Sequence, residues 1–247
     1  MDNQQLQQEP QPAPIKRWSF SGLKLFEQCP YAAKLRYVDK LPSPERTDEN
    51  HPLVRGSRLH QAAEDYITGQ SNGLPKPLNQ FTDDYGHLRE AYEEGRVRVE
   101  EEWGYDFNLA ETAWRDPNVW LLVKVDAIEF VDESAAVLVD LKTGKKYGNE
   151  VKHNQQGQLY AIAAFLRFPK LDSIRVEFWY PDQQGKRTSK YYDRQMIAKY
   201  LPRWIEKGIK VTTAVDFPPK PNVHNCKFCD YGVQKGTGEC IYAVEER

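Results

Sequence analysis

The chain has 247 residues, a formal net charge of -2, 40% hydrophobic residues and 12% aromatic residues. This size suits one large α/β domain, or a core with a smaller appendage, and the near-neutral charge gives no general attraction for nucleic acid. The sequence contains neither an apolar run of about 18 residues nor a charged-then-apolar leader. We therefore expect no membrane contact and a cytoplasmic location, in the host cell if the chain is viral.

The N-terminal part of the chain divides into a tail and a broken helix. Residues 1–14 are rich in Gln and Pro and predict a disordered tail, followed by a single domain over residues 15–247. Residues 18–37 have helical spacing of their apolar residues, but Pro30 must start a new helix, which leaves Cys29 at the break.

The next elements are predicted as helices and loops. A helix over Gly56–Ile67 places His60 and Glu64 one turn apart on one face. The Gly, Pro and Asn content of residues 71–81 predicts a loop, and residues 83–103 predict a charged surface helix.

Strands and helices alternate in the rest of the chain. Strands are predicted near residues 107–114 and 119–130, and the second forms a hairpin with the strand 136–141. A helix over residues 151–168 follows, and it places His153 on the same face as Gln156 and Tyr160. The last elements are a strand pair (174–180 with 190–192, across the turn 182–185), a helix over 195–211 and a cysteine-bearing tail. The pattern is that of an α/β fold.

The strand that ends in Asp140-Leu-Lys142-Thr-Gly144 carries the first chemical signal. Side chains alternate faces along a strand, so Asp140 and Lys142 point to the same side. A carboxylate can hold a hard divalent cation, and a neighbouring lysine can orient or polarise a water. Alone, this pattern is a weak signal, and an exposed ion pair on an edge strand would be the better interpretation of it.

Two further residues, His60 and Asp126, complete a candidate metal site with Asp140. His60, Asp126 and Asp140 offer an imidazole and two carboxylates, which leave coordination positions open on Mg²⁺ or Mn²⁺ for water and a phosphate oxygen. Each residue also has an ordinary structural interpretation: His60 as a surface group, Asp126 as a strand end.

In combination these pieces resemble the PD-(D/E)XK nucleases, and within them the RecB-like branch that includes CRISPR adaptation nucleases. The matching motifs occur in the family order: Gly56-x-x-x-His60, Asp126-Ala-Ile128, Asp140-x-Lys142-Thr-Gly144 and Gln156-x-x-x-Tyr160. The resemblance extends from about Trp18 to Cys240.

The resemblance implies a fold and roles for single residues. The fold would be a restriction-endonuclease-like core, in which helices flank a central mixed sheet. His60, Asp126 and Asp140 would bind the metal with the Leu141 carbonyl, and Lys142 would be the catalytic lysine. Gln156 and Tyr160 would line the site, completing a catalytic set of Asp126, Asp140, Lys142, Gln156 and Tyr160. Glu64 and Glu111 are weaker candidates.

The four cysteines form one pattern: Cys29 far upstream, then Cys226-x-x-Cys229 and Cys240. In an intracellular protein they suit metal binding better than disulfides, and a four-thiolate cage fits either Zn²⁺ or an iron–sulfur cluster. Resemblance to the RecB-like branch implies a 4Fe-4S cluster that joins residues of about 18–40 to the tail at about 215–247. Zn²⁺ and unligated thiols are the alternatives.

Three functions are compatible with these observations. The first is a Mg²⁺- or Mn²⁺-dependent deoxyribonuclease, an exonuclease acting on DNA ends or single strands, with Lys145, Lys146 and Lys152 contacting phosphates or forming a merely solvated loop. The second is a non-catalytic nucleic-acid-binding or assembly subunit with the same fold, and the third is a protein-interaction module. The expected partner is DNA; a partner protein of recombination, repair or CRISPR adaptation is left open.

Overall fold

The structure is a computed structural model that describes residues 14–144 and 148–245. It divides into two compact units, which we call the central unit (Glu45–Trp204) and the terminal unit (Met1–Pro44 with Ile205–Arg247). The predicted disordered tail lies, up to residue 13, outside the described residues.

The central unit is built on a sheet with the strand order β3-β2-β4-β5-β6-β7. Its strands are β2 (Val97–Tyr105), β3 (Glu111–Thr112), β4 (Leu121–Phe130), β5 (Ala135–Leu141), β6 (Ser173–Tyr180) and β7 (Lys186–Asp193). Its helices are α3 (Pro52–Ile67), α4 (Thr82–Glu93) and α5 (Glu150–Arg167), with the short 3-10 helices η1 (Lys76–Phe81) and η2 (Pro181–Gln183). Helix α6 (Met196–Thr212) begins in this unit.

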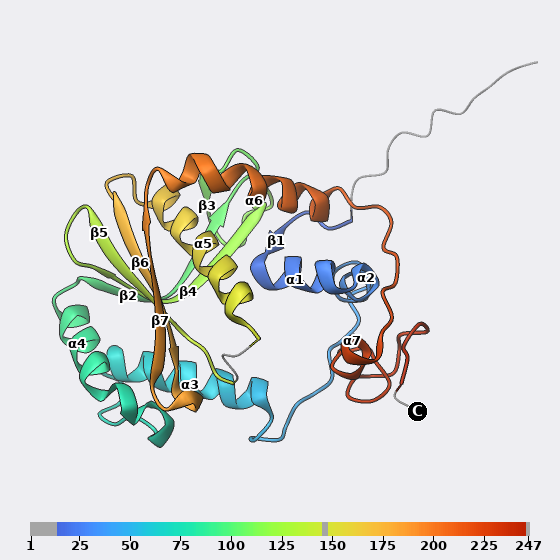
Figure 1. Ribbon diagram of the computed structural model, residues 1–247, viewed down its shortest axis with the longest axis horizontal. Coiled ribbons are helices and arrows are strands. Elements are labelled where there is room, and N and C mark those ends of the chain that lie inside the picture. Colours follow the sequence, from blue (N-terminus) through green and yellow to red (C-terminus); the bar gives the residue numbers. More distant parts are fainter. Residues whose placement is uncertain (1–13, 145–147, 246–247) are drawn as a thin grey trace, which may run out of the picture. The chain divides into compact units, whose positions relative to one another are not determined.

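The sheet is mixed and covered by helices on both faces. β5 and β6 are parallel and are connected through α5, whereas the other neighbours along this order are antiparallel. Helices α3 and α4 cover one face and α5 covers the other (Figure 1). The predicted α/β class, with a mixed sheet between helices, is therefore confirmed.

The core on the α3 and α4 side contains aliphatic residues of both helices and of the strands beneath them. Its aromatic centre is Phe81, which is fully buried and stacks on Trp179 with ring centroids 5.0 Å apart. Tyr85 meets Trp179 edge-on at 5.3 Å. The cluster comprises Leu59, Ala63, Ile67, Leu78, Phe81, Tyr85, Leu88, Ala91, Val97, Ala127, Val139, Leu141 and Trp179.

The strands β4 and β5 separate part-way along their length. They pair from Phe130 with Ala136 up to Ala127 with Val139, and Asp126 and Asp140 follow directly beyond this last pair. The amide of Leu141 donates instead to the Asp126 carboxylate, over 2.8 Å. The opening of the sheet thus leaves two carboxylates where the ladder ends.

Three predicted elements differ from the structure. The helix predicted over residues 83–103 is wrong in its second half, because α4 ends at Glu93 and the chain continues as β2. The predicted strand 107–114 reduces to the two residues of β3, and the predicted loop 71–81 contains η1. The acidic run of β2 hid its strand periodicity, since Glu favours helices in sequence-based reasoning.

The terminal unit combines both ends of the described chain. It contains β1 (Trp18–Ser19), α1 (Phe20–Gln28), α2 (Pro30–Tyr37), the end of α6 and α7 (Val223–Lys227). Ser19 caps α1 by accepting from the Gly22 amide, and Pro30 opens α2, so Cys29 lies between the helices as predicted.

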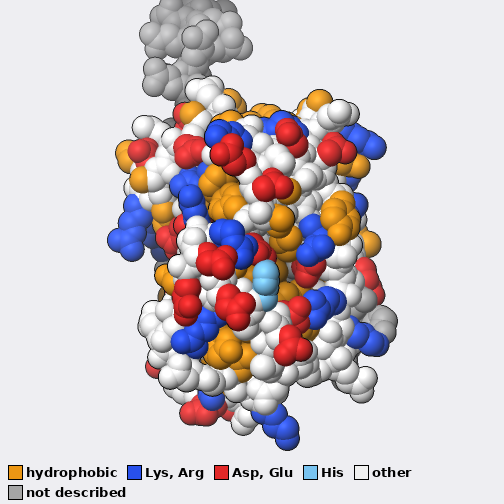
Figure 2. Space-filling model, turned by 90° about the vertical axis from the view of Figure 1, so that its left-hand side faces the viewer, with side chains coloured by type: hydrophobic (Ala, Val, Ile, Leu, Met, Phe, Trp, Pro, Cys, Tyr) orange, Lys and Arg blue, Asp and Glu red, His pale blue; other side chains and the backbone are white. Residues whose placement is uncertain are grey.

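Charges of both signs are interspersed over the face shown in Figure 2. This mixture agrees with the small net charge of -2. Among the described helices, none has the length and hydrophobicity needed to cross a membrane.

Replacing Phe81 by Ala should lower the free energy of unfolding by about 3–5 kcal/mol, because it leaves a cavity beside Trp179. Urea unfolding measures the change. Phe107→Ala is the matched control, since the Phe107 side chain is 60% exposed and contacts Trp120 edge-on; it should cost less than about 1.5 kcal/mol. Equal losses in the two variants would contradict the assignment of Phe81 to the core.

Candidate functional site

A cavity of about 540 Å³ opens in the central unit where β4 and β5 separate. Its walls come from α3, β2, β4, the end of β5 and α5. It is lined by the sequence-predicted residues His60, Asp126, Asp140, Lys142, Gln156 and Tyr160, and also by Glu64, Glu100 and Lys124.

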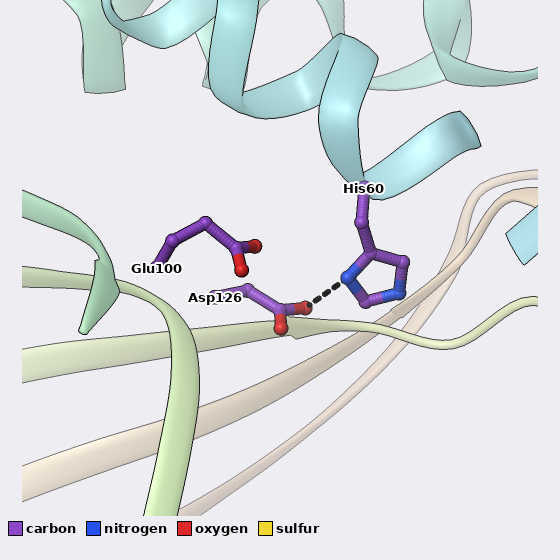
Figure 3. Close-up of side chains that lie close together, drawn as sticks. All are labelled: His60, Glu100 and Asp126. Carbon is purple, nitrogen blue, oxygen red and sulfur yellow. Dashed lines mark ion pairs between the residues drawn. The ribbon is translucent and has the colours of Figure 1, made fainter. Parts of the chain in front are cut away.

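His60, Glu100 and Asp126 form the tightest group of donors in this cavity (Figure 3). One ligand atom of each lies within 4.8 Å of the others. His60 Nδ1 lies 3.1 Å from Asp126 Oδ2. An imidazole and two carboxylates at this spacing form a candidate site for a divalent cation.

Sequence reasoning missed Glu100, which it placed in a helix. In the register of β2 and β4, Val99 faces Ala127 and Glu101 faces Val125, so Glu100 lies across from Asp126. Cross-strand neighbours project from the same face of a sheet, which explains why the two carboxylates meet. Glu100 also has a φ of 49°, rare for a residue other than glycine, and it forms an ion pair of 2.6 Å with Lys124.

The electrostatics of the site reflect an excess of negative charge. Burial lowers the pKa of His60, but its hydrogen bond with Asp126 and the charges of Asp126, Asp140 and Glu100 raise that pKa overall. Burial and the nearby charge of Asp140 raise the pKa of Asp126, although His60 and Lys142 oppose them. A divalent cation at this position would relieve the repulsion between the carboxylates.

Asp140 is oriented by α5 and by its own strand. Its side chain is buried, and Oδ1 accepts a hydrogen bond of 2.6 Å from the Tyr160 hydroxyl. Gln156 Nε2 donates to the same hydroxyl over 2.7 Å, so Gln156, Tyr160 and Asp140 form one chain of hydrogen bonds. Lys142 Nζ lies 2.6 Å from Asp140 Oδ2 and 5.4 Å from the ring centre of Phe178.

A family model described as the PD-(D/E)XK nuclease superfamily matches residues 17–233, nearly the whole chain. The chain belongs to this superfamily.

Solved structures give weaker similarities. SSO0001 has a TM-score of 0.45 at 14% identity, covering 87% of this chain and 83% of its own. A provisionally assigned exonuclease of Eubacterium rectale reaches 0.48 at 15% identity, with coverages of 87% and 86%. An alkaline exonuclease of Laribacter hongkongensis reaches 0.31 at 9% identity, with coverages of 81% and 87%. No curated protein shows significant similarity to the chain.

The remaining predicted residues of this superfamily member are placed as follows. Leu141 buries its side chain in the core and gives its amide to Asp126. Lys152 is exposed in the first turn of α5, whereas Lys145 and Lys146 lie outside the described residues. Of the weaker candidates, Glu64 lines the cavity. Glu111 forms an ion pair with Arg167 on α5.

His153 lies one turn before Gln156 on α5 and contacts two aromatic residues of β6. Its Nδ1 atom is 2.8 Å from the Tyr180 hydroxyl, and its ring stacks on Phe178 with centroids 5.6 Å apart. Burial, and then the positive charge of Lys142, lowers the pKa of His153 to about 4. The imidazole is therefore neutral at physiological pH.

The imidazole of His153 should remain neutral down to about pH 4 in the folded chain, compared with 6.5 for an ordinary histidine. As the pH falls, the unfolded chain binds a proton at this histidine before the folded chain does. The neutral His153 therefore stabilises the fold fully above about pH 6.5, and this stabilisation is lost as the pH falls toward 4. A ¹H NMR titration, with the ring signal assigned by its loss in His153→Gln, measures this. A titration midpoint near 6.5 would contradict the packing described.

The four cysteines line a second cavity, of about 130 Å³, within the terminal unit. None of them is in a disulfide, and the Lys220 amide donates to Cys29 Sγ over 3.5 Å. Burial raises the pKa of Cys229 and of Cys240, and the other sulfurs of the cavity add to this.

Proposed function

We propose that this chain is a divalent-metal-dependent deoxyribonuclease of the RecB-like branch, acting as an exonuclease on DNA ends or single strands. The observation that carries the proposal is the cavity at the opening of β4 and β5. Around it a superfamily member gathers an imidazole, four carboxylates and two lysines from α3, β2, β4, β5 and the residues directly after β5. The RecB-like motifs favour the exonuclease, because they include His60 on its helix and Gln156-x-x-x-Tyr160.

The donor set suits Mg²⁺ or Mn²⁺, which prefer carboxylate oxygens and, for Mn²⁺, accept imidazole. His60, Asp126 and Asp140 would hold the ion, and Glu100 is close enough to His60 and Asp126 to take part. When bound, the cation supplies a Lewis acid that polarises the phosphodiester and acidifies water.

Lys142 is the residue best placed to act on the reacting phosphate. Its Nζ lies in the cavity, 2.6 Å from Asp140, and its ammonium group carries three donors. One donor can hold Asp140 while another orients a water or donates to a phosphate oxygen as negative charge develops there. The hydrogen bonds from Gln156 to Tyr160 and from Tyr160 to Asp140 keep this carboxylate in place.

We expect DNA phosphates to be contacted by lysines that follow the Asp140–Gly144 motif in the sequence. These are Lys145, Lys146 and Lys152, and each could neutralise one phosphate. The net charge of -2 requires such local contacts, because the chain as a whole does not attract DNA.

Asp126→Asn, Asp140→Asn and Lys142→Ala should each reduce DNA hydrolysis at least about 100-fold, because each removes a ligand or a donor to the developing charge. Release of nucleotides from end-labelled DNA in Mg²⁺ or Mn²⁺ measures this. Glu133→Gln and Lys170→Ala are matched controls, since these residues form an exposed ion pair of 2.9 Å; both variants should retain full activity.

Three results would contradict all or part of the proposed function. Full hydrolysis in all three site variants would exclude this cavity as the active site. Tight DNA binding by the unaltered chain without turnover in either metal would favour the non-catalytic nucleic-acid-binding subunit. Cleavage of closed circular DNA would retain the nuclease but exclude an exonuclease.

We also propose that Cys29, Cys226, Cys229 and Cys240 ligate a 4Fe-4S cluster. Two observations support this: all four sulfurs line one cavity of the terminal unit, and the chain carries the RecB-like motifs whose branch implies such a cluster. Such a cluster would hold the N-terminal helices and the C-terminal tail together.

Protein purified without oxygen should contain iron and acid-labile sulfide in equal amounts, about four of each per chain. Metal and sulfide analysis with a visible absorption spectrum measures this. Cys226→Ser and Cys240→Ser should lose the iron and lower the thermal stability of the chain. One zinc per chain without sulfide would instead indicate a structural zinc site.

A further inference from the structure

The metal centre depends on the position of α3 relative to the end of β5. His60 is carried by α3, whereas Asp126, Asp140 and Lys142 are carried by the sheet and the turn after it. The strands are fixed to one another by backbone hydrogen bonds, but a helix on a sheet is held by side chains. The second half of α3 packs into the core through Leu59, Ala63 and Ile67.

The carboxylate of Asp182 joins the first turn of α3 to the sheet end. Asp182, in η2 directly after β6, accepts two hydrogen bonds from the Arg55 guanidinium, of 2.8 and 2.5 Å. Asp182 Oδ2, which accepts one of these two hydrogen bonds, also accepts a third hydrogen bond, of 2.7 Å, from the amide of Gly144. Asp182 thus binds both the helix that carries His60 and the turn that follows Lys142.

The two segments that Asp182 joins also touch one another. A Cβ atom on Gly56 would lie 3.0 Å from Thr143 Oγ1, so a glycine allows the helix to approach the turn. Gly144 has a φ of +101°, which a side chain would strain. In this conformation the Gly144 amide donates to the Asp182 carboxylate.

We propose that Asp182 is a positioning residue for the metal centre, which sets the separation between the first turn of α3 and the Lys142–Gly144 turn. This inference rests on the proposed function, because it assigns Asp182 to the same site. His60 follows Arg55 by five residues, or about 7.5 Å along the helix axis. A tilt of the first turn therefore displaces the His60 imidazole relative to Asp126.

The state of Asp182 agrees with this role. The Arg55 hydrogen bonds, with a smaller contribution from the Gly144 amide, hold its pKa below the ordinary value despite partial burial. Asp182 is therefore ionised throughout the neutral range, and the connection is present wherever a nuclease of this kind would act. Bidentate pairing gives it a defined direction as well as a charge.

The central unit offers a matched control. Arg187 donates two hydrogen bonds to Asp84, of 2.9 and 2.6 Å, which join β7 to α4 outside the metal cavity. The side chains of this pair are 43% and 30% exposed, against 35% and 25% for Arg55 and Asp182. Loss of either pair should lower the free energy of unfolding to a similar extent. Only loss of the Asp182 pair should weaken metal binding.

The experiment measures Mn²⁺ binding by calorimetry, together with kcat and KM on end-labelled DNA. Asp182→Ala and Arg55→Ala should each weaken Mn²⁺ binding by about tenfold, as the loss of a residue that orients metal ligands usually does. The double variant should lose no more than Asp182→Ala alone, because both changes break one connection. Asp182→Asn keeps an acceptor oxygen, so its Mn²⁺ affinity should lie between those of Asp182→Ala and the unaltered chain. The control variant Asp84→Ala should bind Mn²⁺ as tightly as the unaltered chain.

The possible outcomes distinguish failure of the Asp182 proposal from failure of the proposed nuclease function. If the unaltered chain binds Mn²⁺ and cuts DNA while Asp182→Ala does both equally well, the positioning role is wrong and the nuclease stands. Equal weakening of Mn²⁺ binding in Asp84→Ala and Asp182→Ala would also overturn it, because general destabilisation would then suffice. If the unaltered chain neither binds Mn²⁺ nor cuts DNA, both proposals fail.

Discussion

The candidate site exists because two hydrogen-bonded strands separate. β4 and β5 pair up to Ala127 and Val139, and the next residues toward the opening are Asp126 and Asp140. A freed backbone amide in a protein interior requires an acceptor, and the Asp126 carboxylate supplies one to Leu141. The separation thus creates the cavity, exposes two carboxylates to it and fixes the direction of one of them. The other parts of the site are arranged around this opening.

The second constraint is the cost of bringing carboxylates together. The carboxylates of Asp126, Asp140 and Glu100 each have a cationic or protonatable partner within about 3 Å. These partners are His60, Lys142 and Lys124, respectively. Buried carboxylates without such partners would be protonated or would destabilise the fold. The pairs therefore keep the donors close together before any cation arrives, and a divalent ion then competes with partners that are already in position.

The sequence predicted what depends on local periodicity and on motif order. The hairpin that carries Asp126 and Asp140 and the helix with Gln156 could be inferred because their apolar residues follow periods of 2 and 3.6. Glu100 was missed because it lies in a run of three glutamates, although Val97 and Val99 before it and Trp103 and Tyr105 after it alternate as a strand requires. The partner of Asp182 could not be inferred, since a turn aspartate has many local uses and Arg55 is 127 residues distant.

The composition of the terminal unit has a consequence for biosynthesis. The central unit is one continuous segment, whereas the terminal unit takes its parts from both sides of it in the sequence. Closing a loop of this length carries an entropic cost. A ribosome delivers the whole central segment before the last cysteines emerge. The thiol of Cys29 therefore lacks its three partners in the cysteine cavity until Cys226, Cys229 and Cys240 have been synthesised.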